Sequence, residues 1–123
     1  MAEARRLAAE KRGRRSETVA ALLLRLKGYR ILGRRVRTHA GEIDLIARAP
    51  SGPICFIEVK ARADEARAAD AVSQRQRGRI TRAAALYLAS RPELARDGAR
   101  FDVVTVSPRS LPRHLRDAWR PGD

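Results

Sequence analysis

The sequence has few aromatic residues, a single cysteine and no long apolar run. Aromatic side chains make up 4% of the 123 residues, so aliphatic packing must supply most of the folding free energy. Cys55 has no partner for an intramolecular disulfide, and its place in an apolar run predicts a buried structural thiol rather than a nucleophile. No apolar run approaches the roughly 20 residues of a bilayer span, and the charged start of the chain lacks the apolar centre of a secretory signal. We therefore expect a cytoplasmic protein without a membrane segment.

Acidic residues are also scarce, because 14 Asp and Glu stand against 27 Lys and Arg and give a net charge of +13. Such an excess favours a polyanionic partner, with nucleic acid first and an anionic membrane surface second. The membrane is the weaker alternative, since the basic stretches lack the bulky apolar face of an interfacial helix. Lysine itself is rare: all the basic residues except Lys11, Lys27 and Lys60 are arginine.

The length allows one domain with a single core. We expect a basic, solvated arm at residues 1–15 and one domain at residues 16–123. The first helix is predicted from Glu17 to Lys27, with Ser16 as its N-cap and Gly28 as its stop. Four aliphatic residues have the spacing of a core-facing stripe: Val19, Leu22, Leu23 and Leu26. The opposite side is also apolar apart from Glu17, which we place at the margin of a buried cleft.

The rest of the chain predicts three strands, a long helix and a last strand. The expected bounds are strands at 29–38 with a kink at Gly33, at 41–48 and at 54–62, a polar connection at 63–70, a helix at 71–89 capped by Asp70, a strand at 100–106 and a short amphipathic tail around Leu115 and Trp119.

The second and third strands carry charged residues at alternate positions. On the second strand, side-chain alternation places Glu42, Asp44 and Ile46 on the face opposite Ile43 and Leu45. On the third strand it places Ile54, Phe56, Glu58 and Lys60 on the face opposite Cys55, Ile57 and Val59. A five-residue loop at 49–53 would pair positions whose numbers sum to 102, so that Asp44 faces Glu58 and Glu42 faces Lys60.

Two carboxylates that face each other across a hairpin repel, so this pairing needs a compensating cation. A divalent ion such as Mg²⁺ would supply it, because Mg²⁺ takes oxygen ligands from one or two carboxylates together with a substrate phosphate. Lys60, on the same face as Glu58, could meet the same substrate. The plain alternative is a solvated strand face. The continuous apolar run before Glu58 argues against it, because such a run is typical of a strand covered on both sides.

These strands resemble the core of the PD-(D/E)xK restriction-endonuclease-like superfamily, and more narrowly the YraN-type uncharacterised bacterial family. The similarity covers nearly the whole chain and is carried by Gly13 to Glu17, Gly28 to Leu32, Gly41 to Ile46, Phe56 to Lys60, Val72-Ser73, Tyr87-Leu88, Arg100 to Val104 and His114 to Trp119. Two positions depart from the family pattern, which usually has a lysine at Gln76 and an Asn-Trp pair at Arg35-Val36.

The resemblance implies an α/β fold with an αβββαβ core, a mixed central sheet flanked by helices. It implies that Asp44 and Glu58, with the Val59 carbonyl, ligate Mg²⁺ (or Mn²⁺) and that Lys60 assists the attacking water. Glu17 would stand near a metal-bound water or a second ion. Around them, Glu42 could pair with Lys60, with a purely structural salt bridge as an equal alternative. Gln76 could reach the site from the long helix or could simply be an amide satisfied at the end of the core.

Binding would come from arginines on the long helix and the arm: Arg75, Arg77, Arg79, Arg82, Arg14 and Arg15. With no cluster of stacking aromatics, we expect backbone-directed binding, with DNA favoured over RNA. The sequence thus predicts a metal-dependent endonuclease acting on structured or branched DNA, as in repair or recombination. A homodimer is one expected form of the protein. The alternatives are a non-catalytic nucleic-acid-binding module and an RNA- or ribosome-associated factor.

Overall fold

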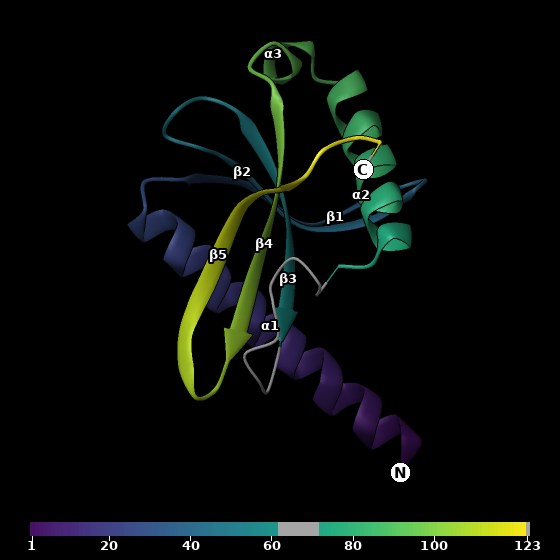
Figure 1. The fold of residues 1–123 in the computed structure, drawn as a ribbon. Helices are drawn as coiled ribbons and strands as arrows, with labels where there is room; N and C mark the ends of the chain where they lie inside the picture. Colours follow the sequence, from purple (N-terminus) through teal and green to yellow (C-terminus); the bar gives the residue numbers. More distant parts are fainter. Residues whose placement is uncertain (62–71, 123) are drawn as a thin grey trace.

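The structure, a computed structural model, describes residues 1–61 and 72–122, with only the backbone described at residues 9, 10 and 12. Its elements are α1 (Ala2–Leu26), β1 (Arg30–Thr38), β2 (Gly41–Arg48), β3 (Ile54–Ala61), α2 (Gln74–Ala89), α3 (Pro92–Ala95), β4 (Ala99–Ser107) and β5 (Ser110–Trp119) (Figure 1). The polar connection expected at 63–70 and the helix start expected at Ala71 lie outside the described residues.

The strands form one five-stranded sheet in the order β1-β2-β3-β4-β5. Only the β3–β4 pair is parallel among these neighbours, and the other three pairs are antiparallel. The α/β class and the mixed sheet expected from the sequence are therefore confirmed. The kink expected at Gly33 is also present, as a register shift between Ile31 and Gly33. A Cβ atom at Gly33 would lie 2.7 Å from Cγ2 of Val36, which explains why glycine stands there.

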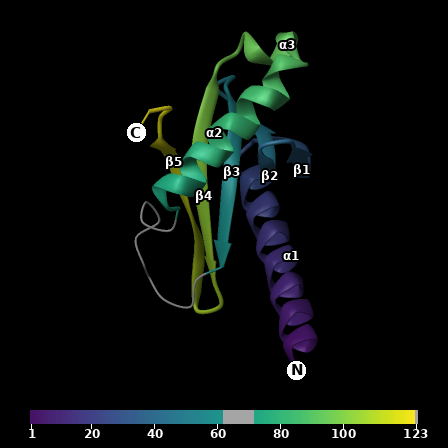
Figure 2. The ribbon, with the colours of Figure 1, turned by 90° about the vertical axis from the view of Figure 1, so that its right-hand side faces the viewer.

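Helices α1 and α2 pack against the sheet through two separate cores. On the α2 side, the core holds Ile80, Ala83 and Tyr87 with apolar residues of β2 to β5. On the α1 side, it holds Ala20, Ala21 and Leu24 with residues of β2, β3 and β4 that include Cys55. Figure 2, turned by 90°, also shows that the N-terminal part of α1 projects beyond the sheet. Cys55 is fully buried, as predicted.

The first helix differs from its prediction in start and orientation. It begins at Ala2 rather than Glu17, because residues 1–15 are rich in Ala, Arg and other good helix formers, and Ser16 lies within it. Its buried side carries Glu17, Ala20, Ala21 and Leu24. Of the four residues predicted to meet the core, the partly buried Leu23 packs against it, whereas the other three are turned outward, with exposed fractions of 38% for Val19, 56% for Leu22 and 78% for Leu26. The stop at Gly28 is confirmed by its φ of +89°.

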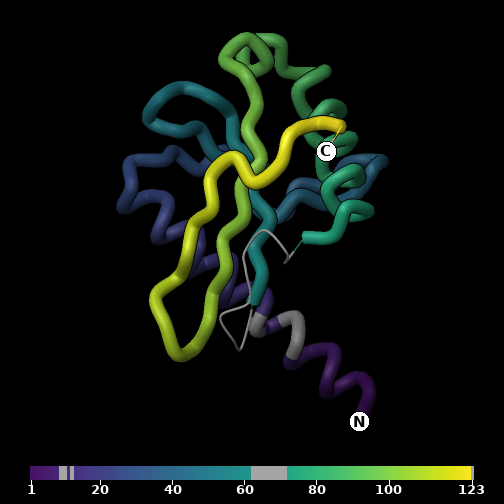
Figure 3. The backbone as a smooth tube through the Cα atoms, in the orientation of Figure 1, coloured from purple at the N-terminus to yellow at the C-terminus, as the bar shows by residue number. Residues whose placement is uncertain are grey.

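The long helix and the C-terminal tail also differ from their predictions. Helix α2 begins at Gln74 with Ser73 as its N-cap, because the Ser73 hydroxyl accepts a hydrogen bond from the Gln76 N–H in a capping box. Asp70, the expected cap, lies outside the described residues. The expected amphipathic tail is strand β5, whose Trp119 stacks on Phe101 with ring centroids 5.2 Å apart. Figure 3 traces the backbone to the C-terminal end of β5. A 3.2 Å hydrogen bond from Trp119 Nε1 to Thr81 Oγ1 links this end of the strand to α2.

Of the helices in the described residues, none combines the length and the apolar character of a membrane span.

Candidate functional site

The candidate site lies where β2 and β3 separate. The hairpin pairs Leu45 with Ile57, and the pairing continues to Arg48 with Ile54, so the predicted sum of 102 is confirmed. This ladder ends one residue short of Asp44 and Glu58. Beyond it, the Asp44 carboxylate replaces a main-chain acceptor: its Oδ2 accepts a 2.8 Å hydrogen bond from the Val59 N–H. The strands are therefore held together at this point by a side chain rather than by backbone pairing.

The side-chain alternation expected for β2 breaks at Asp44. Ile43 and Ile46 share the core on the α2 side, whereas Leu45 lies in the core on the α1 side. The prediction that Ile43 and Leu45 share a face is therefore wrong, and the change of side falls where the ladder with β3 ends. On β3 the alternation is regular for the core residues, with Ile54 and Phe56 on the α2 side and Cys55, Ile57 and Val59 on the α1 side.

Four of the predicted catalytic residues form one electrostatic cluster. Lys60 Nζ lies 3.2 Å from Glu58 Oε1, and both side chains are mostly buried, with exposed fractions of 21% and 14%. Burial, and then the charge of Glu58, raise the pKa of Asp44 to about 7, and the charge of Glu17 adds to this effect. Lys60 acts in the opposite direction on the same pKa. We call Glu17, Asp44, Glu58 and Lys60 the acid cluster.

Glu17 reaches this cluster from α1, where it is 8% exposed. Its Oε1 accepts a 2.6 Å hydrogen bond from Arg35 Nε on β1, which makes a charge-assisted ion pair. Arg35 and Asp44 lie at the same level of the β1–β2 ladder, between the pairs Arg34–Leu45 and Val36–Ile43. This pairing could not be predicted from the sequence, because Glu17 and Arg35 are 18 residues apart on different elements.

The structure does not bring the two supporting residues into the cluster. The Glu42 carboxylate lies 3.5 Å from Arg37 Nε, so its expected pairing with Lys60 is wrong. Glu42 on β2 is instead the direct neighbour of Arg37 on β1 in the β1–β2 ladder. The Gln76 side chain closes the capping box, since its Oε1 accepts a 3.2 Å hydrogen bond from the Ser73 N–H. Of the two interpretations of Gln76, a side chain that reaches the site or an amide satisfied within the fold, the second therefore applies.

The predicted binding arginines are distributed over α1 and α2. Five of them are exposed or nearly so: Arg14, Arg15, Arg75, Arg79 and Arg82. Arg77 is half-buried, because its Nε donates a 3.1 Å hydrogen bond to the Val72 carbonyl and its guanidinium lies 5.9 Å from the Trp119 ring centre. The α1 and α2 arginines sit on helices that pack on opposite faces of the sheet.

A second polar cluster was not predicted. Asp102, fully buried in β4, accepts hydrogen bonds from Arg100, His114 and the Asp117 N–H at 2.8 to 3.0 Å. Burial alone would raise the pKa of Asp102, but the His114 and Arg100 hydrogen bonds hold it at about 2. Lys27 lies 2.6 Å from the other nitrogen of His114. In the sequence, the one sign of this cluster was an acid, Asp102, within the otherwise apolar run Phe101 to Val104.

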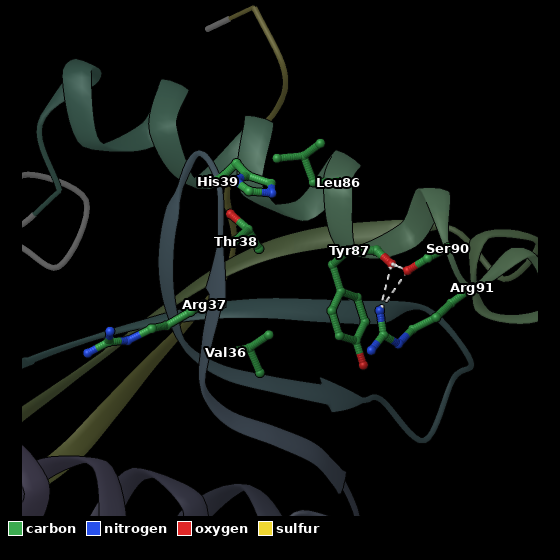
Figure 4. Close-up of a pocket in the computed structure, with 8 residues that line it drawn as sticks. All are labelled: Val36, Arg37, Thr38, His39, Leu86, Tyr87, Ser90 and Arg91. Carbon is green, nitrogen blue, oxygen red and sulfur yellow. Dashed lines mark hydrogen bonds between the residues drawn. The ribbon is translucent and has the colours of Figure 1, made fainter.

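A cavity of about 260 Å³ lies between the β1–β2 hairpin and the C-terminal half of α2 (Figure 4). Arg91 stacks on its Tyr87 wall, with the guanidinium carbon 3.9 Å from the ring centre, and Arg37 points away from the other lining residues. The lining contains no carboxylate: Val36, Arg37, Thr38, His39, Leu86, Tyr87, Ser90 and Arg91. The cavity is therefore basic and apolar, and distinct from the acid cluster.

The fold and the cluster define an α/β protein with a mixed five-stranded sheet and acidic groups gathered where two strands separate. The chain belongs to the uncharacterised protein family UPF0102, whose model matches residues 16–106, and the YraN-type family expected from the sequence is thereby confirmed.

Relatives from three bacteria are similar over most of their length. A UPF0102 protein of Parvibaculum lavamentivorans is 53% identical over 115 residues, covering 94% of this chain and 86% of the relative. One of Maricaulis maris is 53% identical over 123 residues, covering 100% and 95%. One of Paramagnetospirillum magneticum is 51% identical over 117 residues, covering 92% and 90%.

Proposed function

We propose that the protein is a Mg²⁺- or Mn²⁺-dependent endonuclease with a restriction-endonuclease-like core, which hydrolyses phosphodiester bonds in structured or branched DNA. The observation that carries this proposal is the convergence of Asp44 and Glu58, from separating strands, with Lys60 Nζ 3.2 Å from Glu58 Oε1. A buried carboxylate whose pKa is raised by a second carboxylate is typical of a site that binds a cation or handles protons.

The residues present fit a divalent ion. Asp44 uses Oδ2 for the Val59 N–H, and Glu58 uses Oε1 for Lys60. Within residues 1–61 and 72–122, the other carboxylate oxygen of each residue has no hydrogen-bond partner. Oxygen atoms of this kind, together with the Val59 carbonyl, are the ligands that Mg²⁺ prefers. No set of three His, Cys, Asp or Glu side chains in the same ranges could hold a metal, so water and a substrate phosphate would complete the coordination.

The ion, when bound, would lower the pKa of a coordinated water and neutralise charge on the phosphoryl oxygens. The protein's own groups have separate tasks. Lys60, held by Glu58, can donate a hydrogen bond to the attacking water or to a phosphoryl oxygen. The Val59 N–H fixes the orientation of Asp44. The net charge of +13 would attract the nucleic acid, and basic side chains would bind its phosphates.

The test is a cleavage assay on branched, flapped and single-stranded DNA with Mg²⁺, Mn²⁺ or EDTA. We expect cleavage with either ion, none with EDTA, and a loss of about 100-fold or more in Asp44→Asn and Glu58→Gln. Binding of DNA should survive in both variants. Glu93→Gln is the matched control, because this exposed acid lies on α3 and its replacement should leave cleavage unchanged.

A second candidate is a nucleic-acid-binding module without turnover. It is favoured by the Lys60–Glu58 ion pair, which already neutralises one acid of the cluster. Tight binding without metal-dependent cleavage of any substrate would support this module and contradict the nuclease. A preference for RNA over DNA in the same binding assay would point to an RNA- or ribosome-associated factor. The homodimer stays a prediction.

A further inference from the structure

Arg35 has a backbone conformation that its residue type disfavours. Its φ is +51°, in the left-handed region, where a residue with a Cβ is strained. Glycine or asparagine adopts this region more readily. Strained residues of this kind persist where the surrounding contacts fix them, and they gather at functional sites. The contact that fixes Arg35 is its ion pair with Glu17.

This ion pair engages Glu17, the carboxylate of the acid cluster that a second ion would need as a ligand. Glu17 retains 11% exposure of its side chain and holds Arg35 Nε at 2.6 Å. The charges of Glu42 and Asp44 also act on Arg35, after that of Glu17, and raise the pKa of its guanidinium. An arginine remains charged at any physiological pH. A second divalent ion at Glu17 would therefore have to displace a permanent cation.

The charge balance points to one ion. Ionised Glu17, Asp44 and Glu58 carry three negative charges, and Arg35 and Lys60 carry two positive charges. One divalent ion together with one phosphodiester group brings the assembled site to neutrality. A second divalent ion would leave one more uncompensated positive charge in this partly buried place when Arg35 is present than when a neutral residue replaces it, so the second ion is more costly in wild type.

We propose that Arg35 is a resident cation in place of a second metal ion: it holds Glu17, so that the acid cluster takes one divalent ion, at Asp44 and Glu58. The inference rests on the proposed nuclease function and deepens it. Among the described residues the Nη groups of Arg35 have no partner, and its side chain is 35% exposed. These Nη groups form the fork with which arginine binds a phosphate, so Arg35 also offers the substrate a contact.

The test counts Mn²⁺ ions by electron paramagnetic resonance of the full chain without substrate. Wild type should saturate at one ion per chain. Arg35→Gln, which keeps a side chain of similar shape without charge, should gain a second and weaker ion. That ion should disappear in the double variant Arg35→Gln/Glu17→Gln. Arg34→Gln is the matched control, because it removes the same charge one residue away, where the side chain contacts the Thr18 hydroxyl instead of an acid.

A second readout is the Mg²⁺ dependence of cleavage, whose Hill coefficient should be about 1 in wild type and rise above 1 in Arg35→Gln. Arg35→Asn, which suits the positive φ, repeats both measurements in a variant with a relaxed backbone. Two ions in wild type, one of them lost in Glu17→Gln, would overturn the inference while leaving the nuclease intact. No bound ion and no cleavage would overturn the proposed function together with the inference. A single bound ion in Arg35→Gln would also overturn the inference about Arg35, but not the proposed nuclease.

Discussion

At the scale of single residues, Asp44 links the site to the stability of the protein. Its pKa is raised from 3.8 to about 7, so between these pH values the folded state binds a proton at Asp44 that the unfolded state has released. Stability falls with pH wherever the folded state binds more protons. We expect the free energy of unfolding to fall as the pH rises from about 4 to about 7, by a few kcal/mol at most.

Urea unfolding of wild type and Asp44→Asn between pH 4 and 8 checks this prediction. The difference between the two isolates Asp44, because the other titrating groups are shared. The variant should lack the fall, and added Mg²⁺ should stabilise wild type more at pH 8 than at pH 5, since the ion binds the ionised carboxylate. Parallel pH profiles of the two proteins would contradict the raised pKa.

Some single residues were predictable from the sequence and others were not. Cys55, Gly28 and Gly33 were, because an apolar neighbourhood, a helix stop and a strand kink are local signals. The partners of Asp102 and Glu17 were not. Both acids are satisfied by groups brought together only by the sheet order and the packing of α1, and no spacing along the chain encodes those contacts.

At the scale of elements, α1 shows why a helix face can be misassigned. Both sides of residues 17–27 are apolar, and hydropathy favours the side with more Leu and Val. The structure buries the side with Ala20 and Ala21, because small side chains let the helix approach the sheet closely at native packing density. The hairpin register, by contrast, followed from loop length alone, which is a local property.

This orientation of α1 predicts opposite effects for neighbouring substitutions. Ala21 is 1% exposed, so Ala21→Leu should overpack the core and lower the free energy of unfolding by about 1–3 kcal/mol. Leu22 is 56% exposed, so Leu22→Ala should change it by about 0.5 kcal/mol or less. Urea unfolding of both variants measures the difference. If Leu22→Ala is the more damaging change, α1 packs through the face that the sequence favoured.

At the scale of the whole molecule, the exposed arginines of α1 and α2 lie on helices that pack on opposite faces of the sheet, so the positive charge of the described residues is not gathered on one face. Long-range attraction of a polyanion needs only the total charge, but the strength of its salt dependence counts the phosphates that are actually contacted. Composition therefore predicts only a class of partner, a polyanion, and that class stays a prediction. It could not say which arginines touch the partner, because Arg77 is engaged within the fold and other exposed arginines lie far from α2 in the sequence.

Salt titration of DNA binding separates the contacting arginines from the rest. If Arg75, Arg79 and Arg82 each contact a phosphate of duplex DNA, replacing all three by Gln should reduce the slope of log affinity against log salt by about 2.7. The matched control replaces three exposed arginines outside α2: Arg25, Arg30 and Arg109. This control loses the same net charge, so it should weaken binding at low salt through the long-range field while its slope changes by less than about 1. Equal slopes in the two triple variants would mean that α2 is not the binding surface, and that the polyanion is held by the diffuse charge of the molecule or by the arginines of α1.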